Sequence, residues 1–141
     1  MKFWDTSAVV SLLIEEPATA IARKLVDGDP GIVVWWGTRT ECISAISRRR
    51  REGFFTAKSE REARDVLAAV ASAWSEILPS EQLRLRAERL LSVHSLRAAD
   101  ALQLAAALVW SRGDTSAHVV VSMDERLRDA VGREGFEVLP P

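Results

Sequence analysis

Short apolar segments that alternate with helical ones predict an α/β fold, a three-layer α/β/α sandwich around a short parallel sheet. The clearest strand candidate, Ile32–Trp35, is apolar without interruption, which indicates a strand that is covered on both faces. Residues 2–4, 118–122 and 136–139 are further strand candidates, and residues 76–78 are a weaker one. The helical segments between these strands are expected to cover both faces of the sheet.

Two helices are predicted between the first two strands. The first covers about residues 7–14, and Thr6 or Ser7 is expected to be its N-cap. Pro17 ends this helix and separates it from a second one at about residues 18–26. The glycines, aspartates and proline that follow indicate a loop before the second strand.

Two further helices follow the second strand. One covers about residues 39–51 and ends at Gly53. The next is expected to begin with Ser59 as its N-cap and Glu62 at the capping-box position, and to continue to about Ala73. This region therefore predicts a pair of consecutive helices joined by a short turn.

Three helices complete the expected pattern, at about residues 80–94, 97–110 and 124–133, and Ser80 is the expected N-cap of the first of them. The sequence contains no repeat, no low-complexity segment and no linker-like stretch. We therefore expect residues 1–141 to form a single domain.

The composition is that of a globular protein, with 48% apolar and 28% charged residues. The single cysteine excludes an internal disulfide and is typical of a reducing compartment, so a cytoplasmic protein is expected. The predicted strand at residues 2–4 leaves no room for a signal peptide, and no apolar run reaches the roughly 18 residues of a transmembrane helix. The net charge of −1 disfavours a simple nucleic-acid-binding module but is compatible with a nuclease whose acidic site binds divalent ions.

Three carboxylates occupy positions at which the predicted fold would bring them together. Asp5 directly follows the first strand, and Asp124 follows the strand at residues 118–122. Glu41 lies in the first turn of the helix after the second strand. Because the carboxyl ends of parallel strands meet at one edge of a sheet, we expect these three side chains to share that edge.

A fourth carboxylate, Asp100, lies in the most apolar helix of the chain. From Ala98 to Trp110 the only polar side chains are Asp100 and Gln103. A helix that is apolar nearly all round is expected to be buried, and two residues three apart share one of its faces. An acid in this setting predicts a function, so we add Asp100 to the acidic set.

Carboxylates gathered in this way repel one another. Two unit charges about 4 Å apart repel by roughly 4 kcal/mol at an effective dielectric constant near 20, and several such pairs approach a domain's marginal stability of roughly 5–15 kcal/mol. No lysine or arginine flanks all four positions, so the acids must be partly protonated or must bind a cation. A single acid at the start of a helix is usually a cap, but four converging acids favour a metal site, and oxygen ligands favour Mg²⁺ or Mn²⁺.

Four segments resemble the motifs of PIN-domain nucleases and occur in the same order. They are Phe3–Val10, Thr40–Ala45, Leu96–Ala105 and Ser122–Leu127. The third of these is the most recognisable motif of the family. The resemblance spans the whole chain, and its length and predicted architecture are most similar to the VapC-type toxins of VapBC toxin–antitoxin systems.

This resemblance implies an endoribonuclease that requires Mg²⁺ or Mn²⁺, hydrolyses RNA phosphodiester bonds, forms a homodimer and is inhibited by a cognate antitoxin protein. By matching motif, the catalytic residues would be Asp5, Glu41, Asp100 and Asp124. The metal ligands would be Asp5 and Asp100, and Thr6 and Ser7 would line the site. A metal-activated water would attack the phosphate in line, without a histidine as general base.

Three other interpretations remain open from the sequence. A haloacid-dehalogenase-like phosphatase needs a second aspartate two residues after the first, where this chain has Ser7. A response-regulator receiver domain needs a lysine at the end of its last strand, where this chain has Leu139-Pro140-Pro141. A catalytically silent PIN-like interaction module is the third alternative, although none of the four acids is missing.

The Arg48–Arg51 run lies at the end of a predicted helix. Cations are favoured there by the helix dipole, so a solvated helix end is one interpretation. Contact with RNA phosphates is the other, and it predicts a change in the salt dependence of RNA binding when the run is neutralised.

Overall fold

Five parallel strands form one sheet at the centre of the computed structural model, which describes residues 1–141. In sequence order they are β1 (Lys2–Trp4), β2 (Ile32–Trp35), β3 (Ser75–Ile77), β4 (Val119–Val121) and β5 (Glu137–Leu139). Their order across the sheet is β3-β2-β1-β4-β5, and every pairing is parallel. The predicted parallel sheet is confirmed, and all carboxyl ends lie at one edge.

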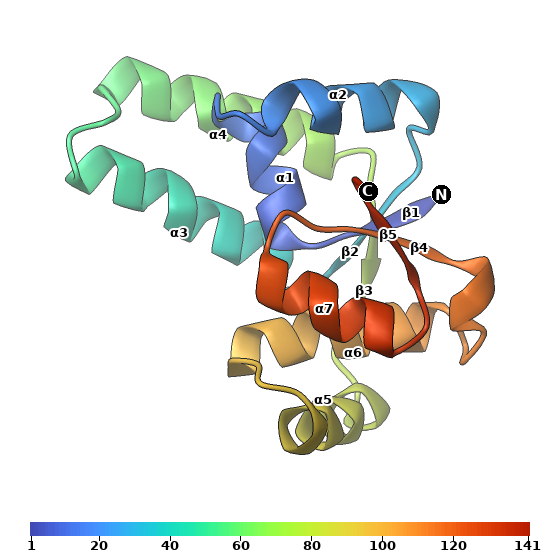
Figure 1. Cartoon of the computed structure of the whole chain (residues 1–141). Coiled ribbons are helices and arrows are strands. Elements are labelled where there is room, and N and C mark those ends of the chain that lie inside the picture. Colours follow the sequence, from blue (N-terminus) through green and yellow to red (C-terminus); the bar gives the residue numbers. More distant parts are fainter.

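Seven α-helices cover the two faces of this sheet (Figure 1). On one face lie α1 (Thr6–Leu13), α2 (Thr19–Gly28), α3 (Thr38–Arg51) and α4 (Ala57–Ala71). On the other lie α5 (Glu81–Val93), α6 (Ala98–Trp110) and α7 (Glu125–Arg133). A short 3₁₀ helix, Thr115–Ala117, precedes β4. The expected three-layer α/β/α sandwich is therefore confirmed.

Alternating side chains of the short strands divide the apolar core into two halves. In β1, Phe3 enters the core beneath α5, α6 and α7, whereas Trp4 enters the core beneath α1 to α4. Val33 and Val34 of β2 divide in the same way. This is the period of two expected of strands, and it explains why uninterrupted apolar runs are needed here: each face of the sheet has its own helical layer.

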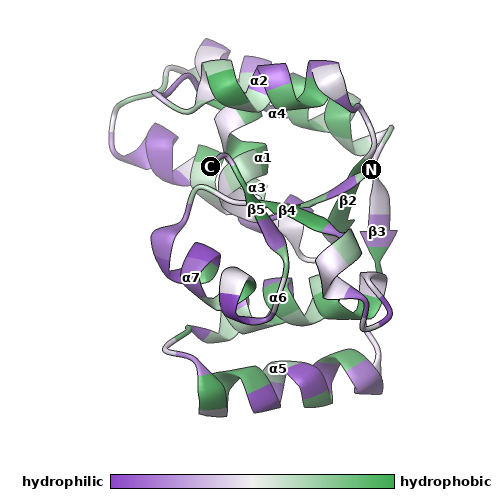
Figure 2. Cartoon of the chain, turned by 45° about the vertical axis from the view of Figure 1, so that its right-hand side comes forward, coloured by the Kyte–Doolittle hydropathy of each residue, from purple (hydrophilic) through white to green (hydrophobic).

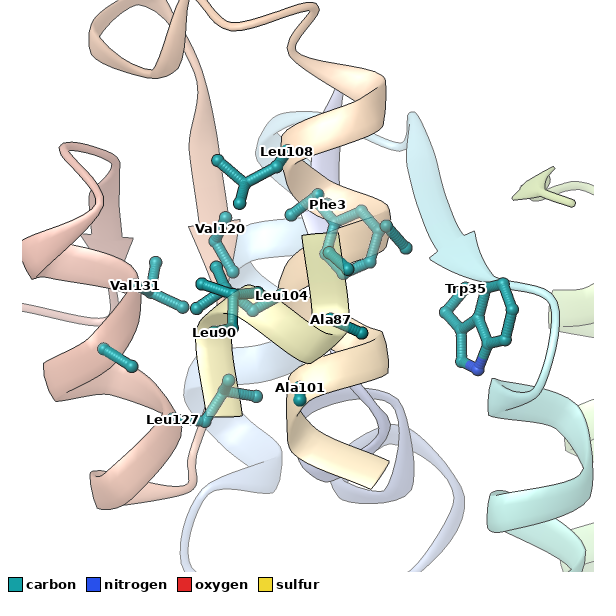
Figure 3. Close-up of a cluster of buried hydrophobic side chains, with 14 of the residues drawn as sticks. Phe3, Trp35, Ala87, Leu90, Ala101, Leu104, Leu108, Val120, Leu127 and Val131 are labelled. Carbon is teal, nitrogen blue, oxygen red and sulfur yellow. The ribbon is translucent and has the colours of Figure 1, made fainter. Parts of the chain in front are cut away.

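Helix α6 lies between the sheet and α5, so α5 is the outermost helix on this face (Figure 2). Its small and apolar side chains allow close packing on both sides, and Leu104 and Leu108 lie in the core cluster drawn in Figure 3. From Ala101 onward most of this helix is buried, as its composition predicts. In its first turn Ala98 and Ala99 are exposed, and Asp100 is half-buried.

Two helix starts differ from the sequence prediction. The N-cap of α1 is Asp5, whose carboxylate accepts a hydrogen bond from the backbone N–H of Ala8, so the prediction of Thr6 or Ser7 is wrong. The N-cap of α4 is Thr56, which accepts from the backbone N–H of Ser59, so Ser59 is not the cap. In both places an earlier oxygen side chain satisfies the exposed helix donors.

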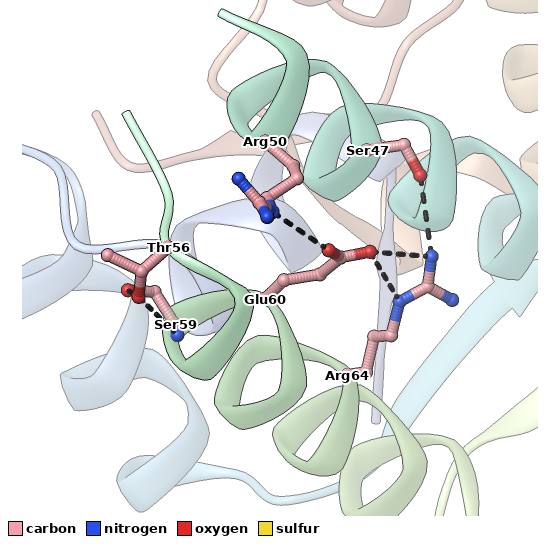
Figure 4. Close-up of polar contacts among 6 residues, drawn as sticks. All are labelled: Ser47, Arg50, Thr56, Ser59, Glu60 and Arg64. Atoms are coloured by element: carbon pink, nitrogen blue, oxygen red, sulfur yellow. Dashed lines mark hydrogen bonds and ion pairs between the residues drawn. The ribbon is translucent and has the colours of Figure 1, made fainter. Parts of the chain in front are cut away.

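Helices α3 and α4 form a hairpin whose two helices are joined by an ion pair (Figure 4). Glu60 of α4 lies 3.6 Å from Arg50 Nε of α3 and 3.2 Å from Arg64 Nη2 of its own helix. The guanidinium of Arg49 lies over the ring of Phe54, 5.6 Å from its centre. Arg49 and Arg50 of the Arg48–Arg51 run thus make contacts within the hairpin.

None of the helices combines the length and the apolar character that crossing a membrane requires.

Candidate active site

A pocket of about 990 Å³ lies at the carboxyl edge of the sheet. All four acids singled out from the sequence line it: Asp5, Glu41, Asp100 and Asp124. They come from the ends of β1 and β4 and from the first turns of α3 and α6. The structure therefore brings together four carboxylates that are far apart in the chain.

Asp5 is the most buried of these acids, and only neutral groups donate to its carboxylate. Ser7 Oγ lies 2.7 Å from Oδ1, the Ala8 backbone N lies 3.0 Å from Oδ1, and Ser122 Oγ lies 3.0 Å from Oδ2. Ser7 Oγ in turn accepts from the backbone N–H of Met123 at 2.8 Å. These bonds connect the end of β1 to the end of β4 and fix the orientation of the carboxylate.

Burial raises the pKa of Asp5 to about 6. The hydrogen bonds from Ala8, Ser7 and Ser122 oppose this increase, and the negative charge of Asp124 adds to it. No cationic side chain is among the groups that act on this carboxylate, so its ionised form is costly here. In its ionised form Asp5 is therefore a buried carboxylate that a positive partner would stabilise.

Gln103 organises the side of the pocket formed by α1, α3 and α6. Its amide Nε2 lies 2.7 Å from Thr6 Oγ1, 3.1 Å from Thr38 Oγ1 and 3.2 Å from Glu41 Oε1, so these three acceptors share its two hydrogens. Gln103 and Thr38 are buried. Burial raises the pKa of Glu41, hydrogen bonds from Thr6 and Gln103 oppose that change, and the charge of Asp100 adds to it.

Asp100 and Asp124 lie nearer to the mouth of the pocket, where both are half-buried. Burial and then the negative charge of Asp124 raise the pKa of Asp100, while Arg97 and Arg126 lower it. Asp124 is also the N-cap of α7, because its Oδ1 accepts from the backbone N–H of Leu127 at 2.9 Å. Like Asp5, it both caps a helix and lines the pocket.

The donor chemistry of the pocket fits a hard divalent cation. Carboxylate and hydroxyl oxygens line it, and Mg²⁺ is usually held by one or two carboxylates together with several waters. In the side-chain positions of this structure, no three Asp, Glu, His or Cys groups are close enough to share one ion. A site with two carboxylate ligands and several waters agrees with the oxygen-lined pocket and with the absence of a third close ligand. Asp5 has the fixed orientation that such a site needs.

The two histidines lie outside this pocket. His94 Nε2 lies 2.7 Å from Glu134, and His118 Nδ1 lies 2.6 Å from the backbone oxygen of Asp114. Both contacts are structural.

Sequence reasoning missed several polar residues of this site. Ser122 follows β4, so the rule that placed Asp124 at the sheet edge would also have placed Ser122 there. Arg97 and Arg126 also line the pocket, and no sequence signal had singled them out. Of the Arg48–Arg51 run, for which contact with RNA was one of two interpretations, Arg48 lines the pocket as well. The buried Thr38 had no distinguishing signal, because its role depends on how α3 is rotated toward Gln103.

Comparison with known proteins identifies related folds. The chain is similar to FitAcB from Neisseria gonorrhoeae, with a TM-score of 0.67 and 15% identity, over 98% of this chain and 96% of that one. It is similar to PAE2754 from Pyrobaculum aerophilum, with a TM-score of 0.67 and 19% identity, over 98% of this chain and 88% of that one. It is also similar to a toxin–antitoxin complex from Klebsiella pneumoniae, with a TM-score of 0.62 and 17% identity, over 88% of this chain and 87% of that one. No curated protein matches the sequence.

At these identities the solved structures establish a shared fold. The family is established by the sequence itself, because residues 2–132 match the profile of the PIN domain. That match includes all four acids of the pocket. The chain therefore belongs to the PIN-domain family.

Proposed function

We propose that this protein is a metal-dependent endoribonuclease that acts as the VapC-type toxin of a toxin–antitoxin pair. The observation that carries the proposal is the convergence of Asp5, Glu41, Asp100 and Asp124 on one pocket. PIN domains are generally nucleases, which supports a hydrolase acting on nucleic acid. One of the similar structures is a toxin–antitoxin complex, which supports an antitoxin partner.

The metal in this proposal is Mg²⁺ or Mn²⁺, with Asp5 and Asp100 as its protein ligands. Such an ion, when bound, lowers the pKa of a water and stabilises negative charge on the scissile phosphate. Asp5 suits the role of ligand because its neutral donors fix the carboxylate without neutralising it. Asp100 lies at the half-buried mouth, where a substrate phosphate has access.

The remaining side chains of the pocket orient the acids or offer an oxygen to water. Gln103 Nε2 donates to Glu41 and holds its carboxylate toward the pocket. Only Oδ1 of Asp124 is used in capping α7, so Oδ2 is available to a water. Ser7 orients Asp5 by donating to it, and Thr6 accepts from Gln103. No step in this scheme uses a histidine.

Three further expectations belong to the same proposal. Residues 1–141 would act as one nuclease domain, two copies would form a homodimer, and the protein would work in the cytoplasm. These expectations come from the resemblance to VapC-type toxins, and each can be tested separately from catalysis.

The test is cleavage of a panel of transfer and ribosomal RNAs with Mn²⁺ and with EDTA. Wild-type protein is expected to cleave at least one RNA in Mn²⁺ and none in EDTA, and Asp100→Asn is expected to be inactive. Asp65→Asn is the matched control, because Asp65 is an exposed acid on α4 outside the pocket. Cleavage by Asp100→Asn at the wild-type rate would exclude the proposed site, and undiminished cleavage in EDTA would exclude the proposed metal.

A further inference from the structure

Three arginines line the acidic pocket. Arg48 belongs to α3, Arg97 directly precedes α6, and Arg126 lies in the first turn of α7. All three are exposed, and none takes part in an ion pair. They share the pocket with six acids, which are Asp5, Glu16, Glu41, Asp100, Asp124 and Glu125. Their guanidinium groups form no ion pairs within the protein and can therefore bind a ligand.

Arg48 extends the pocket along α3, away from the sheet. Glu41, Ser44, Ala45 and Arg48 all line it, and this spacing places them in one stripe on the helix. Arg48 lies seven positions after Glu41, which corresponds to about 10 Å along the helix axis. On this wall the backbone of Arg48 therefore lies about two helical turns beyond that of Glu41.

Of the Arg48–Arg51 run, only Arg48 lines the pocket. Arg49 stacks on Phe54 and Arg50 pairs with Glu60, so both contact the α3–α4 hairpin. Arg51 is exposed and does not line the pocket. Of the two interpretations of this run, a solvated helix end describes Arg51, whereas Arg48 faces the candidate site.

Arg97 and Arg126 occupy the opposite wall. In Figure 1, α3 lies on one side of the site, and the N-terminal ends of α6 and α7 lie on the other. The charges of Arg97 and Arg126 both act on Asp100, which places these two side chains close to the acids. Guanidinium groups are therefore present on both walls, with the carboxylates between them.

We propose that Arg48, Arg97 and Arg126 bind backbone phosphates of the RNA on the two sides of the scissile bond, so that the strand crosses the pocket from α3 to α6 and α7. This inference rests on the proposed nuclease function and adds the path of the substrate. Arginine suits the role because its planar fork binds phosphate oxygens in pairs. The charge balance requires such groups: six carboxylates would repel a polyanion, and divalent ions at the acids offset only part of that charge.

The experiment compares Arg48→Gln, Arg97→Gln, Arg126→Gln and the triple variant with wild type. The substrate is a short single-stranded RNA that the wild-type protein cleaves, and kcat and KM are measured in Mn²⁺ over a range of KCl concentrations. The triple variant is expected to have a raised KM, with kcat at saturating RNA changed much less. The slope of log(kcat/KM) against log[KCl] is expected to flatten by about 0.7 for each arginine removed, or about 2 for the triple variant.

The matched control carries Arg51→Gln, Arg61→Gln and Arg112→Gln, which remove three exposed arginines outside the pocket. This control is expected to retain the wild-type KM and salt slope, and thermal melting verifies that all variants fold. Arg48→Gln against Arg51→Gln is the sharpest single pair, since both residues belong to the same run. If wild type cleaves RNA but the pocket variants keep its KM and slope, the substrate path is wrong and the nuclease proposal stands. If wild type cleaves no RNA, the nuclease proposal itself fails, and this inference fails with it.

Discussion

Two aspartates near the opposite ends of strand β1 are held in opposite ways. Beside its amino end, Asp29 accepts from Lys2 Nζ at 2.8 Å and from the N-terminal ammonium of Met1, and these bonds hold the pKa of Asp29 well below its usual range. At its carboxyl end, Asp5 is buried among neutral donors, and burial raises the pKa of its carboxyl to about 6.

The contrast is between an acid whose negative charge stabilises the folded chain and an acid whose negative charge destabilises it. Asp29 has two cationic partners, so its charge stabilises the start of the sheet. Asp5 has none, so its charge reduces the stability of the folded chain until a proton or a metal ion neutralises it. A perturbed acid in a pocket is a candidate for function for this physical reason. Three predictions test the contrast.

The largest effect is expected from Asp5→Asn. If Asp5 is a metal ligand, losing it removes several kcal/mol of transition-state stabilisation, so RNA cleavage should fall by at least about 100-fold. In EDTA at neutral pH the same variant should melt at a higher temperature than wild type, because the uncompensated charge is gone. Asparagine still caps α1, and the hydroxyls of Ser7 and Ser122 can reverse their hydrogen bonds.

Cleavage assays and thermal melting of the same preparation measure both effects. A lower melting temperature in EDTA would mean that Asp5 stabilises the fold as Asp29 does, and wild-type cleavage would remove Asp5 from the active site.

A second, intermediate effect concerns pH and metal. The pKa of Asp5 is about 6 in the folded protein and 3.8 ordinarily, so protonation favours the folded state. Its contribution is complete below pH 3.8, is lost as the pH rises through 6, and is on the order of 3 kcal/mol. A divalent ion replaces the proton, so Mn²⁺ should raise the melting temperature at neutral pH and have little effect near pH 4.

Melting curves with Mn²⁺ and with EDTA across this pH range provide the measurement. Burial also raises the pKa values of Glu41 and Asp100, which adds to the effect with the same sign. Asp5→Asn should reduce the difference between the Mn²⁺ and EDTA curves. An equal Mn²⁺ effect at both ends of the pH range would contradict competition between proton and metal.

The smallest effect is expected from Asp29→Asn. Removing the partner of Met1 and Lys2 should lower the melting temperature slightly, because these ion pairs are partly exposed to water. Since the pKa of Asp29 is lowered, its contribution is present above the ordinary aspartate pKa and is lost as the pH falls. RNA cleavage should be unchanged. A large loss of cleavage in this variant would show that the two ends of β1 are not independent.

Most of the fold could be predicted because its signals are local. Uninterrupted apolar runs such as Ile32–Trp35 indicated buried strands, and alternation with helices indicated a parallel sheet. The convergence of Asp5 and Asp124 followed from that topology alone, since parallel strands end at one edge. Strand β3 was less certain because Ser75 and Glu76 are exposed and carry no apolar pattern.

The rest of the site depends on tertiary placement that a single sequence does not encode locally. Gln103 shares a helix face with Asp100, but its contacts with Thr38 and Glu41 depend on how α3 packs beside α6. The caps at Asp5 and Thr56 were missed because neighbouring serines and threonines satisfy the same rule. In each case several residues were equally suitable by local sequence rules, and the packing of distant segments determined which one makes the contact.

The scattered origin of the pocket acids also bears on when this protein becomes active during its synthesis. The segments that carry Asp5 and Glu41 leave the ribosome early, but the pocket lacks Asp124 and the Ser122 hydroxyl until β4 has been made. A nascent chain interrupted before β4 would also lack the neighbour of β1 on one side. Under the proposed function, an incomplete translation product would therefore be harmless to the cell that makes it.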